Sequence, residues 1–117
     1  MLTEKRQTGN AGEEMARSYL IENGYTILEN NWQFGHLEVD IIAQENETIV
    51  FVEVKTRATT AFGSPEQAVN KQKQRNIIRA ANSYILRHNL NYEVRFDIIA
   101  IVKNQIQHFK DAYSPLW

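Results

Sequence analysis

Four charged side chains stand on two consecutive segments that are otherwise strongly apolar. Glu38 and Asp40 lie in LEVDIIA, and Glu53 and Lys55 lie in FVEVKTR. Residues two apart in a β-strand share a face, so each segment places its two charges on one side of a sheet. Three carboxylates against one ammonium leave a charge of about −2, which a divalent cation would balance. Oxygen ligands of this kind suit Mg²⁺ or Mn²⁺ rather than zinc.

The register of the two segments decides whether these charges meet. A four-residue loop between them would place Asp40 opposite Glu53 and Glu38 opposite Lys55. A two-residue loop at Glu45–Asn46 would place Glu38 opposite Glu53 instead. Both registers bring carboxylates together, whereas a loop of odd length would separate them, because a one-residue slip reverses the faces of a strand. Facing carboxylates repel, so the pattern favours a functional site over a solvated sheet face with a cross-strand salt bridge.

Hydrophobic periodicity predicts the elements that position these side chains. The expected elements are a helix over 10–23, strands over 25–32, 37–44 and 48–57, a helix from an N-cap at Ser64 to about His88, and strands over 92–102 and 106–113. The order α-β-β-β-α-β-β predicts an α/β fold, with a mixed sheet of about five strands and two main helices. We expect residues 1–8 to form a flexible N-terminus and residues 9–117 a single domain.

Length and composition narrow the class of protein. A chain of 117 residues suits one hydrophobic core. No apolar run is long enough to span a membrane, the N-terminus lacks the apolar stretch of a signal peptide, and cysteine is absent, so we expect a cytoplasmic protein without disulfides. The formal net charge is −1, so binding to nucleic acid would need a local basic surface.

Such a basic surface is expected near the second helix. Its candidates are Arg57, Lys71, Lys73 and Arg75, although a solvated helix face explains the helix residues equally well. Lys73 falls inside the apolar stripe of the helix, where a lysine is either snorkelling or directed at an anion. Elsewhere, Asp97 lies in RFDIIA, which echoes EVDIIA, but no E-x-K follows it. Because it alternates with Arg95, we expect it to form an ion pair or to have a role at the edge of the core.

The central motif resembles a known signature. Asp40, twelve intervening residues and Glu53-Val54-Lys55 are similar to the D-(x)n-(D/E)-x-K pattern of the restriction-endonuclease-like superfamily, although Val39 stands where a proline is usual. The segments GNAGEEMARSYLIENGYTILENNW, GHLEVDIIA, FVEVKTR, AVNKQKQRNIIRAANSYI and VRFDIIAI together resemble the YraN family over about residues 9–113. These are small bacterial proteins with a predicted nuclease fold, related to Holliday-junction resolvases.

This resemblance implies a restriction-endonuclease-like core and a Mg²⁺- or Mn²⁺-dependent DNA phosphodiesterase, with branched or recombination intermediates as expected substrates. It implies that Asp40 and Glu53 hold the metal and that Lys55 orients the attacking water or stabilises the phosphate. It also implies an active-site acid near the start of the first helix, where Glu13 stands, and a further metal-binding acid at Glu38.

Two of these acids have structural alternatives. Glu13 could serve only as a carboxylate in the first turn of a helix. Glu38 could serve only as a partner for Lys55, and it is separated from Gly35 by two residues instead of following the glycine directly. Their roles therefore stay open at the level of sequence.

The resemblance also bears on partners. Resolvases act as symmetric dimers because two strands must be cut, so we expect a homodimer. The alternative function is a non-catalytic module that binds nucleic acid with a retained nuclease fold. A protein-interaction scaffold is a third class, which would bind neither metal nor nucleic acid.

Overall fold

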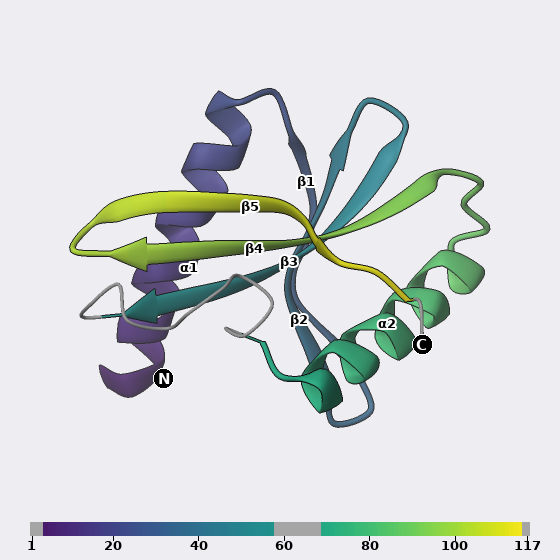
Figure 1. The fold of residues 1–117 in the computed structure, drawn as a ribbon, viewed down its shortest axis with the longest axis horizontal. Helices are drawn as coiled ribbons and strands as arrows, with labels where there is room; N and C mark the ends of the chain where they lie inside the picture. The colour runs from purple at the N-terminus through teal and green to yellow at the C-terminus, as the bar shows by residue number, and fades with distance from the viewer. Residues whose placement is uncertain (1–3, 58–68, 116–117) are drawn as a thin grey trace.

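The computed structural model describes residues 4–57 and 69–115, and for residues 4–10 the backbone only. It is an α/β fold in which two helices flank a mixed five-stranded sheet (Figure 1). The elements are α1 (Glu4–Glu22), β1 (Thr26–Phe34), β2 (Leu37–Glu45), β3 (Thr48–Arg57), α2 (Lys71–Arg87), β4 (Glu93–Val102) and β5 (Gln105–Tyr113). The predicted fold class and element order are confirmed. No helix in the described part of the chain is long and apolar enough to cross a membrane.

The strands lie in the order β1-β2-β3-β4-β5, and only β3 and β4 run parallel. In the β2–β3 hairpin, Gln44 pairs with Ile49 and Glu45 with Thr48. This is the register that places Asp40 opposite Glu53, and it is confirmed, but the turn contains two residues rather than four. Asn46 allows this tight turn because it adopts a left-handed conformation, with φ of 55°.

Each face of the sheet carries its own hydrophobic core. Ile49 and Phe51 of β3 pack in the cluster that includes α2, whereas Val50 and Val52 pack in the cluster that includes α1. Both faces of the central strands are therefore covered, which explains why β2, β3 and β4 are nearly continuous apolar runs. A charged side chain on such a strand is forced into the interior.

The helices begin at other residues than the sequence predicted. Residues 69 and 70 are not helical, and α2 begins at Lys71 with Asn70 as its N-cap, whose side chain accepts a hydrogen bond from the Lys73 N–H at 2.8 Å. The predicted start was wrong because Asn caps a helix as well as Ser does. The expected cap at Ser64 lies outside the described residues. Helix α1 begins at Glu4 rather than after Asn10, so it includes residues 4–8 of the expected flexible N-terminus.

Candidate active site

The site forms where β2 separates from β3. The backbone ladder between the two strands ends at the pair Ile41–Val52. At the next position the Oδ2 atom of Asp40 accepts a hydrogen bond from the Val54 N–H at 2.9 Å. Val39 packs on the α2 side and Ile41 on the α1 side, although residues two apart in a regular strand share a face. β2 therefore twists sharply at Asp40, whose carboxylate replaces a main-chain acceptor.

Asp40 and Glu53 lie next to each other where β2 separates from β3, a point that we call the fork. Their exposed fractions are 9% and 4%, and the two carboxyl groups are close enough for Glu53 to raise the pKa of Asp40. Burial, together with the hydrogen bond and charge of Glu53, raises the pKa of Asp40 to about 8, although the Val54 N–H and Lys73 act in the opposite direction. Without a further cation, Asp40 therefore keeps its proton at neutral pH.

Lys73 is the cation nearest to this pair. Its Nζ atom lies 3.3 Å from Oε2 of Glu53, and its side chain is 44% exposed. The contact is electrostatic only, because the buried Oε2 atom accepts no hydrogen bond. Lys73 is thus directed at an anion, the second of the two alternatives that the sequence left open. One carboxylate oxygen at the centre of the site remains without a hydrogen-bond donor.

Glu13 approaches the same site from α1. Its Oε1 atom accepts a hydrogen bond from Nδ2 of Asn31 at 2.9 Å. Burial raises the pKa of Glu13, the Asn31 hydrogen bond lowers it, and the charge of Asp40 raises it again, with a net increase. The preceding residue, Gly12, permits this approach, because a Cβ atom there would lie 2.7 Å from Oγ1 of Thr56 on β3.

Asn31 is a site residue that the sequence analysis missed. It lies in β1 with φ of 51°, a left-handed conformation that asparagine tolerates better than most residues. The pairs Asn30–Ile41 and Trp32–Val39 place it directly across from Asp40. The available signal was an asparagine pair inside a predicted strand, where asparagine is unfavourable.

The structure does not unite Glu38 with the buried carboxylates. Glu38 is exposed and accepts a hydrogen bond from Nε2 of Gln33 at 2.7 Å. Its pKa is raised by partial burial and by the charges of Asp40 and Glu13, so it lies within electrostatic range of the site. Among the described residues, no three His, Asp or Glu side chains converge closely enough to form a metal site.

The expected pairing of Glu38 with Lys55 was wrong. No ion pair joins these two described residues, because β2 turns away from β3 at Asp40 and the predicted ladder does not reach them. Lys55 keeps the position two residues after Glu53 on β3, and the regular alternation of that strand places both on the α2 side.

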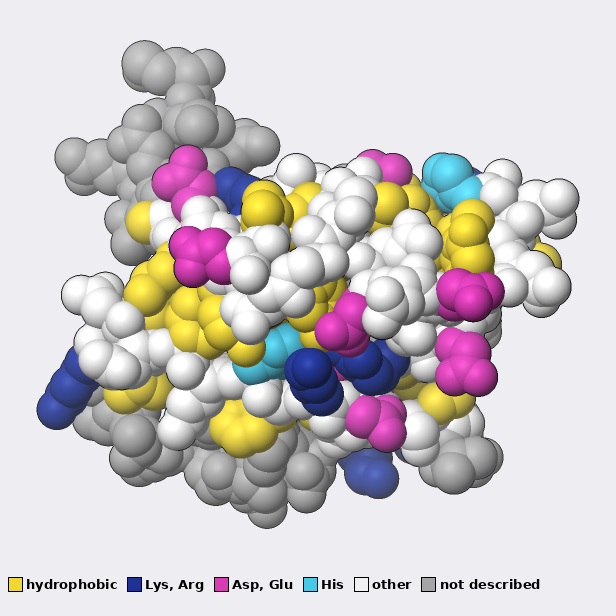
Figure 2. All heavy atoms as spheres, turned by 90° about the horizontal axis from the view of Figure 1, so that it is seen from above, with side chains coloured by type: hydrophobic (Ala, Val, Ile, Leu, Met, Phe, Trp, Pro, Cys, Tyr) yellow, Lys and Arg dark blue, Asp and Glu magenta, His cyan; other side chains and the backbone are white. Residues whose placement is uncertain are grey.

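The predicted nucleic-acid-binding residues lie on two elements, β3 and α2. Arg57 ends β3, and its Nη1 atom donates to the Thr56 carbonyl at 3.0 Å. Lys71, Lys73 and Arg75 occupy the first turns of α2, where Lys71 and Arg75 are exposed. Figure 2 shows another face of the molecule, on which basic and acidic side chains are intermingled. The described residues drawn on that face form no extended basic surface.

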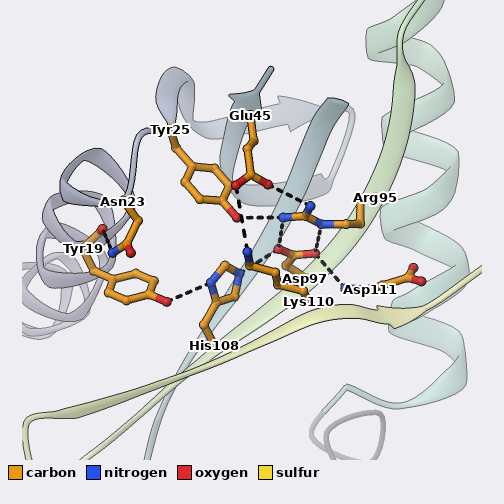
Figure 3. A network of polar contacts seen from close by, with 9 residues as sticks. All are labelled: Tyr19, Asn23, Tyr25, Glu45, Arg95, Asp97, His108, Lys110 and Asp111. Carbon is orange, nitrogen blue, oxygen red and sulfur yellow. Dashed lines mark hydrogen bonds and ion pairs between the residues drawn. The ribbon is translucent and has the colours of Figure 1, made fainter. Parts of the chain in front are cut away.

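A second buried aspartate, Asp97, has a lowered pKa, in contrast to the raised pKa of Asp40 (Figure 3). Arg95 donates two hydrogen bonds to Asp97, both 2.9 Å long, and the Asp111 N–H donates a third at 3.0 Å. The Nε2 atom of His108 lies 2.7 Å from Oδ2 of Asp97. Burial alone would raise the pKa of Asp97, but the hydrogen bonds from His108 and Arg95 lower it below its usual value. The predicted ion pair with Arg95 is confirmed.

This network connects four elements that are distant in sequence. Arg95 also contacts Glu45 at 3.0 Å and Tyr25 at 2.8 Å, and the Tyr19 hydroxyl lies 3.1 Å from Nδ1 of His108. The network therefore connects α1 to the sheet. The sequence analysis missed these partners, since only the Arg95–Asp97 spacing is visible locally.

Comparison with known proteins identifies the family. The model of the uncharacterised protein family UPF0102 matches residues 12–101, a span that includes Glu13, Asp40 and Glu53. The UPF0102 protein of Flavobacterium psychrophilum is 42% identical over 96% of this chain and 98% of its own length. The UPF0102 proteins of Phocaeicola vulgatus and Persephonella marina are 40% and 45% identical, over 99% and 91% of this chain and 100% and 92% of their own lengths. The resemblance to the YraN family is thus confirmed, and the chain belongs to UPF0102.

Proposed function

We propose that this protein is a divalent-metal-dependent phosphodiesterase that cleaves DNA, with branched DNA among its substrates. The observation that carries the proposal is the buried Asp40–Glu53 pair at the point where β2 leaves β3. A protein gains no stability from two facing carboxylates in its interior, because desolvation and mutual repulsion both oppose their ionisation. Such an arrangement is typical of sites that hold a cation.

The residues present fit a hard divalent cation. The Oε2 atom of Glu53 is buried and accepts no hydrogen bond. The atoms of Asp40 and Glu53 that could coordinate a cation are all carboxylate oxygens. Mg²⁺ and Mn²⁺ prefer such ligands and commonly retain water in the other coordination positions. Two carboxylates are therefore sufficient protein ligands, and Glu38 is not needed as a third.

Each residue of the site has a distinct task in this proposal. Asp40 and Glu53 would hold the cation, which when bound would lower the pKa of a water molecule and polarise a phosphoryl oxygen. The Val54 N–H fixes the carboxylate of Asp40, and Lys73 holds that of Glu53. Lys55, on the same side of β3, would stabilise the negative charge that develops on the phosphate. Glu13 is an additional acid that can accept a proton or orient water.

Cleavage assays test the proposal directly. Duplex, single-stranded and four-way-junction DNA should be incubated with the protein and Mg²⁺ or Mn²⁺, and products resolved by denaturing electrophoresis. We expect cleavage that EDTA abolishes and that Asp40→Ala and Glu53→Gln each reduce by at least about 100-fold. Glu47→Gln, in the exposed β2–β3 turn, is the matched control and should cleave normally. Cleavage that survives Asp40→Ala would refute the assignment.

One observation favours the alternative of a binding module without catalysis. Lys73 already lies beside Glu53, so an internal ammonium could neutralise the pair without a metal. Calorimetric titration with Mn²⁺ separates the two functions. A catalytic site should bind Mn²⁺ in a manner that Glu53→Gln weakens, whereas a binding module should show no such binding and should retain affinity for DNA in EDTA.

A further inference from the structure

The turn that connects β1 and β2 lies beside α2 (Figure 1). Two hollows lie between α2 and the segment formed by the end of β1, this turn and the start of β2. The first, of about 190 Å³, is lined by His36, Leu37, Glu38, Lys73, Asn76 and Ile77. The second, of about 550 Å³, is lined by Phe34, Arg79, Asn82, Ser83, Leu86 and Arg87. We call the two hollows together the groove; they lie along α2 from Lys73, whose Nζ atom contacts Glu53, to Arg87.

The charge of α2 indicates a polyanionic occupant. The helix carries five cations, Lys71, Lys73, Arg75, Arg79 and Arg87, and no acid, in a chain whose net charge is −1. From Lys73 to Arg87 the helix extends about 21 Å, which corresponds to about six phosphates of a stacked strand. Arg79 and Arg87 belong to the second hollow, and none of the described residues that line it is acidic.

The second hollow also offers surfaces that suit nucleobases. The rings of Trp32 and Phe34 are parallel, with centroids 6.2 Å apart, and the guanidinium of Arg87 lies 5.5 Å from the Phe34 centroid. Aromatic rings and guanidinium planes are the groups on which unpaired bases stack. Leu86 adds an apolar side chain that is 80% exposed.

Phosphate contacts alone would not distinguish a duplex from a single strand. In a duplex the faces of the bases are covered by their neighbours, so the Phe34, Leu86 and Arg87 surface could contact only the backbone. An unpaired strand can place its phosphates on the cations of α2 and its bases on this surface at the same time.

We propose that the groove between α2 and the β1–β2 turn binds one unpaired strand of nucleic acid, with its bases stacked against Phe34 and Arg87. One part of this inference rests on the proposed function: the bound strand would lead from the groove to Asp40 and Glu53, where it would be cleaved. Binding itself needs no metal and no cleavage. The site would make the protein selective for DNA with single-stranded arms, gaps or junctions.

Fluorescence anisotropy with labelled oligothymidylate, oligouridylate and a blunt hairpin duplex tests the proposal. All measurements are made in EDTA, so they do not depend on whether the protein cleaves. We expect the single strand to bind more tightly than the duplex. Phe34→Leu should weaken single-strand binding by at least about 5-fold, whereas Phe34→Tyr should retain it, because stacking depends on the ring. The two oligonucleotides distinguish DNA from RNA as the strand.

Two further variants control for stability. Leu86→Ser alters a side chain that is almost fully exposed, so it should reduce single-strand affinity without unfolding the protein. Ile21→Ser changes an apolar residue of α1 that is 58% exposed and lies outside the groove, and it should leave affinity unchanged. Equal loss of duplex and single-strand binding in Phe34→Leu would overturn the strand selectivity.

Unchanged single-strand binding in both Phe34→Leu and Leu86→Ser would overturn the site itself. If Leu86→Ser instead abolished self-association in sedimentation and left DNA binding intact, the groove would be an interface between two copies of the chain, and the proposal would be wrong. Failure of metal-dependent cleavage with intact strand binding would refute the proposed function alone.

Discussion

Replacing Asp40 by asparagine should stabilise the metal-free protein at neutral and alkaline pH. The amide oxygen of asparagine can still accept the Val54 hydrogen bond, and its NH₂ group can donate to Glu53. The substitution thus removes a repulsion and retains the hydrogen bonds of the fork. It tests whether the Asp40–Glu53 pair is maintained at a cost to stability.

The size of the effect follows from the pKa of Asp40, which rises from 3.8 to about 8 on folding. Between these pH values the folded chain binds more protons than the unfolded chain, so the free energy of unfolding falls as pH increases. Each pKa unit corresponds to about 1.4 kcal/mol, which gives an upper limit of about 6 kcal/mol above pH 8. Lys73 is partly exposed and can move toward the pair, so we expect Asp40→Asn to gain about 2–4 kcal/mol at pH 8.

Urea denaturation in EDTA at several pH values measures this difference. The gain of Asp40→Asn over the wild type should shrink toward zero as the pH falls below 3.8, the pKa of Asp40 in the unfolded chain, because Asp40 then becomes neutral in both states. Asp97→Asn is the matched control, because Asp97 also precedes Ile-Ile-Ala but has a lowered pKa. It should instead destabilise the protein at neutral pH, by about 3 kcal/mol. An Asp40→Asn variant that is less stable than the wild type at pH 8 would refute the reasoning.

Three other substitutions probe the surroundings of the site. Asn31→Gly should weaken Mn²⁺ binding in calorimetry with little loss of stability. Asn31→Ala should be less stable than Asn31→Gly by about 1 kcal/mol in urea denaturation, because alanine is strained at positive φ. Equal stability of the two variants would contradict this. Gly12→Ala should destabilise the protein by about 1–3 kcal/mol through its clash with Thr56, and Thr56→Ala should rescue it, which thermal melts of the single and double variants would check. Arg95→Met leaves a buried carboxylate without its cation and should cost about 3–5 kcal/mol of unfolding free energy; a loss below 1 kcal/mol would show that His108 is a sufficient partner.

Local patterns were sufficient to predict the regular part of the fold. The alternation of β3 and the apolar runs of the central strands predicted the element order. They left two registers of β2 against β3 open, and the structure has the one that places Asp40 opposite Glu53. The start of α2 was harder to predict, because the residues from Ser64 to Gln67 match a capping box, whereas Asn70 is an equally good N-cap.

The irregular part of the site was not accessible from sequence. Glu38 and Asp40 are two apart, so a regular strand would place them on one face, but the twist at Asp40 sends Glu38 toward solvent and Gln33. The position of Asn31 beside Glu13 likewise depends on a left-handed residue within a strand. His108 and Tyr19 meet only because β5 and α1 fold onto the same end of the sheet. These contacts depend on chain reversals that hydrophobic periodicity does not encode.

The hydrogen bond between Val54 and Asp40 gives the main chain an unusual property. An amide in a central strand is normally shielded by a carbonyl oxygen, which has no charge to lose. The acceptor of the Val54 amide is instead the carboxyl group of Asp40, whose ionisation is opposed by burial and by Glu53. The hydrogen-exchange rate and NMR chemical shift of this one amide should therefore report the charge of Asp40, and with it the arrival of a cation, from within the sheet.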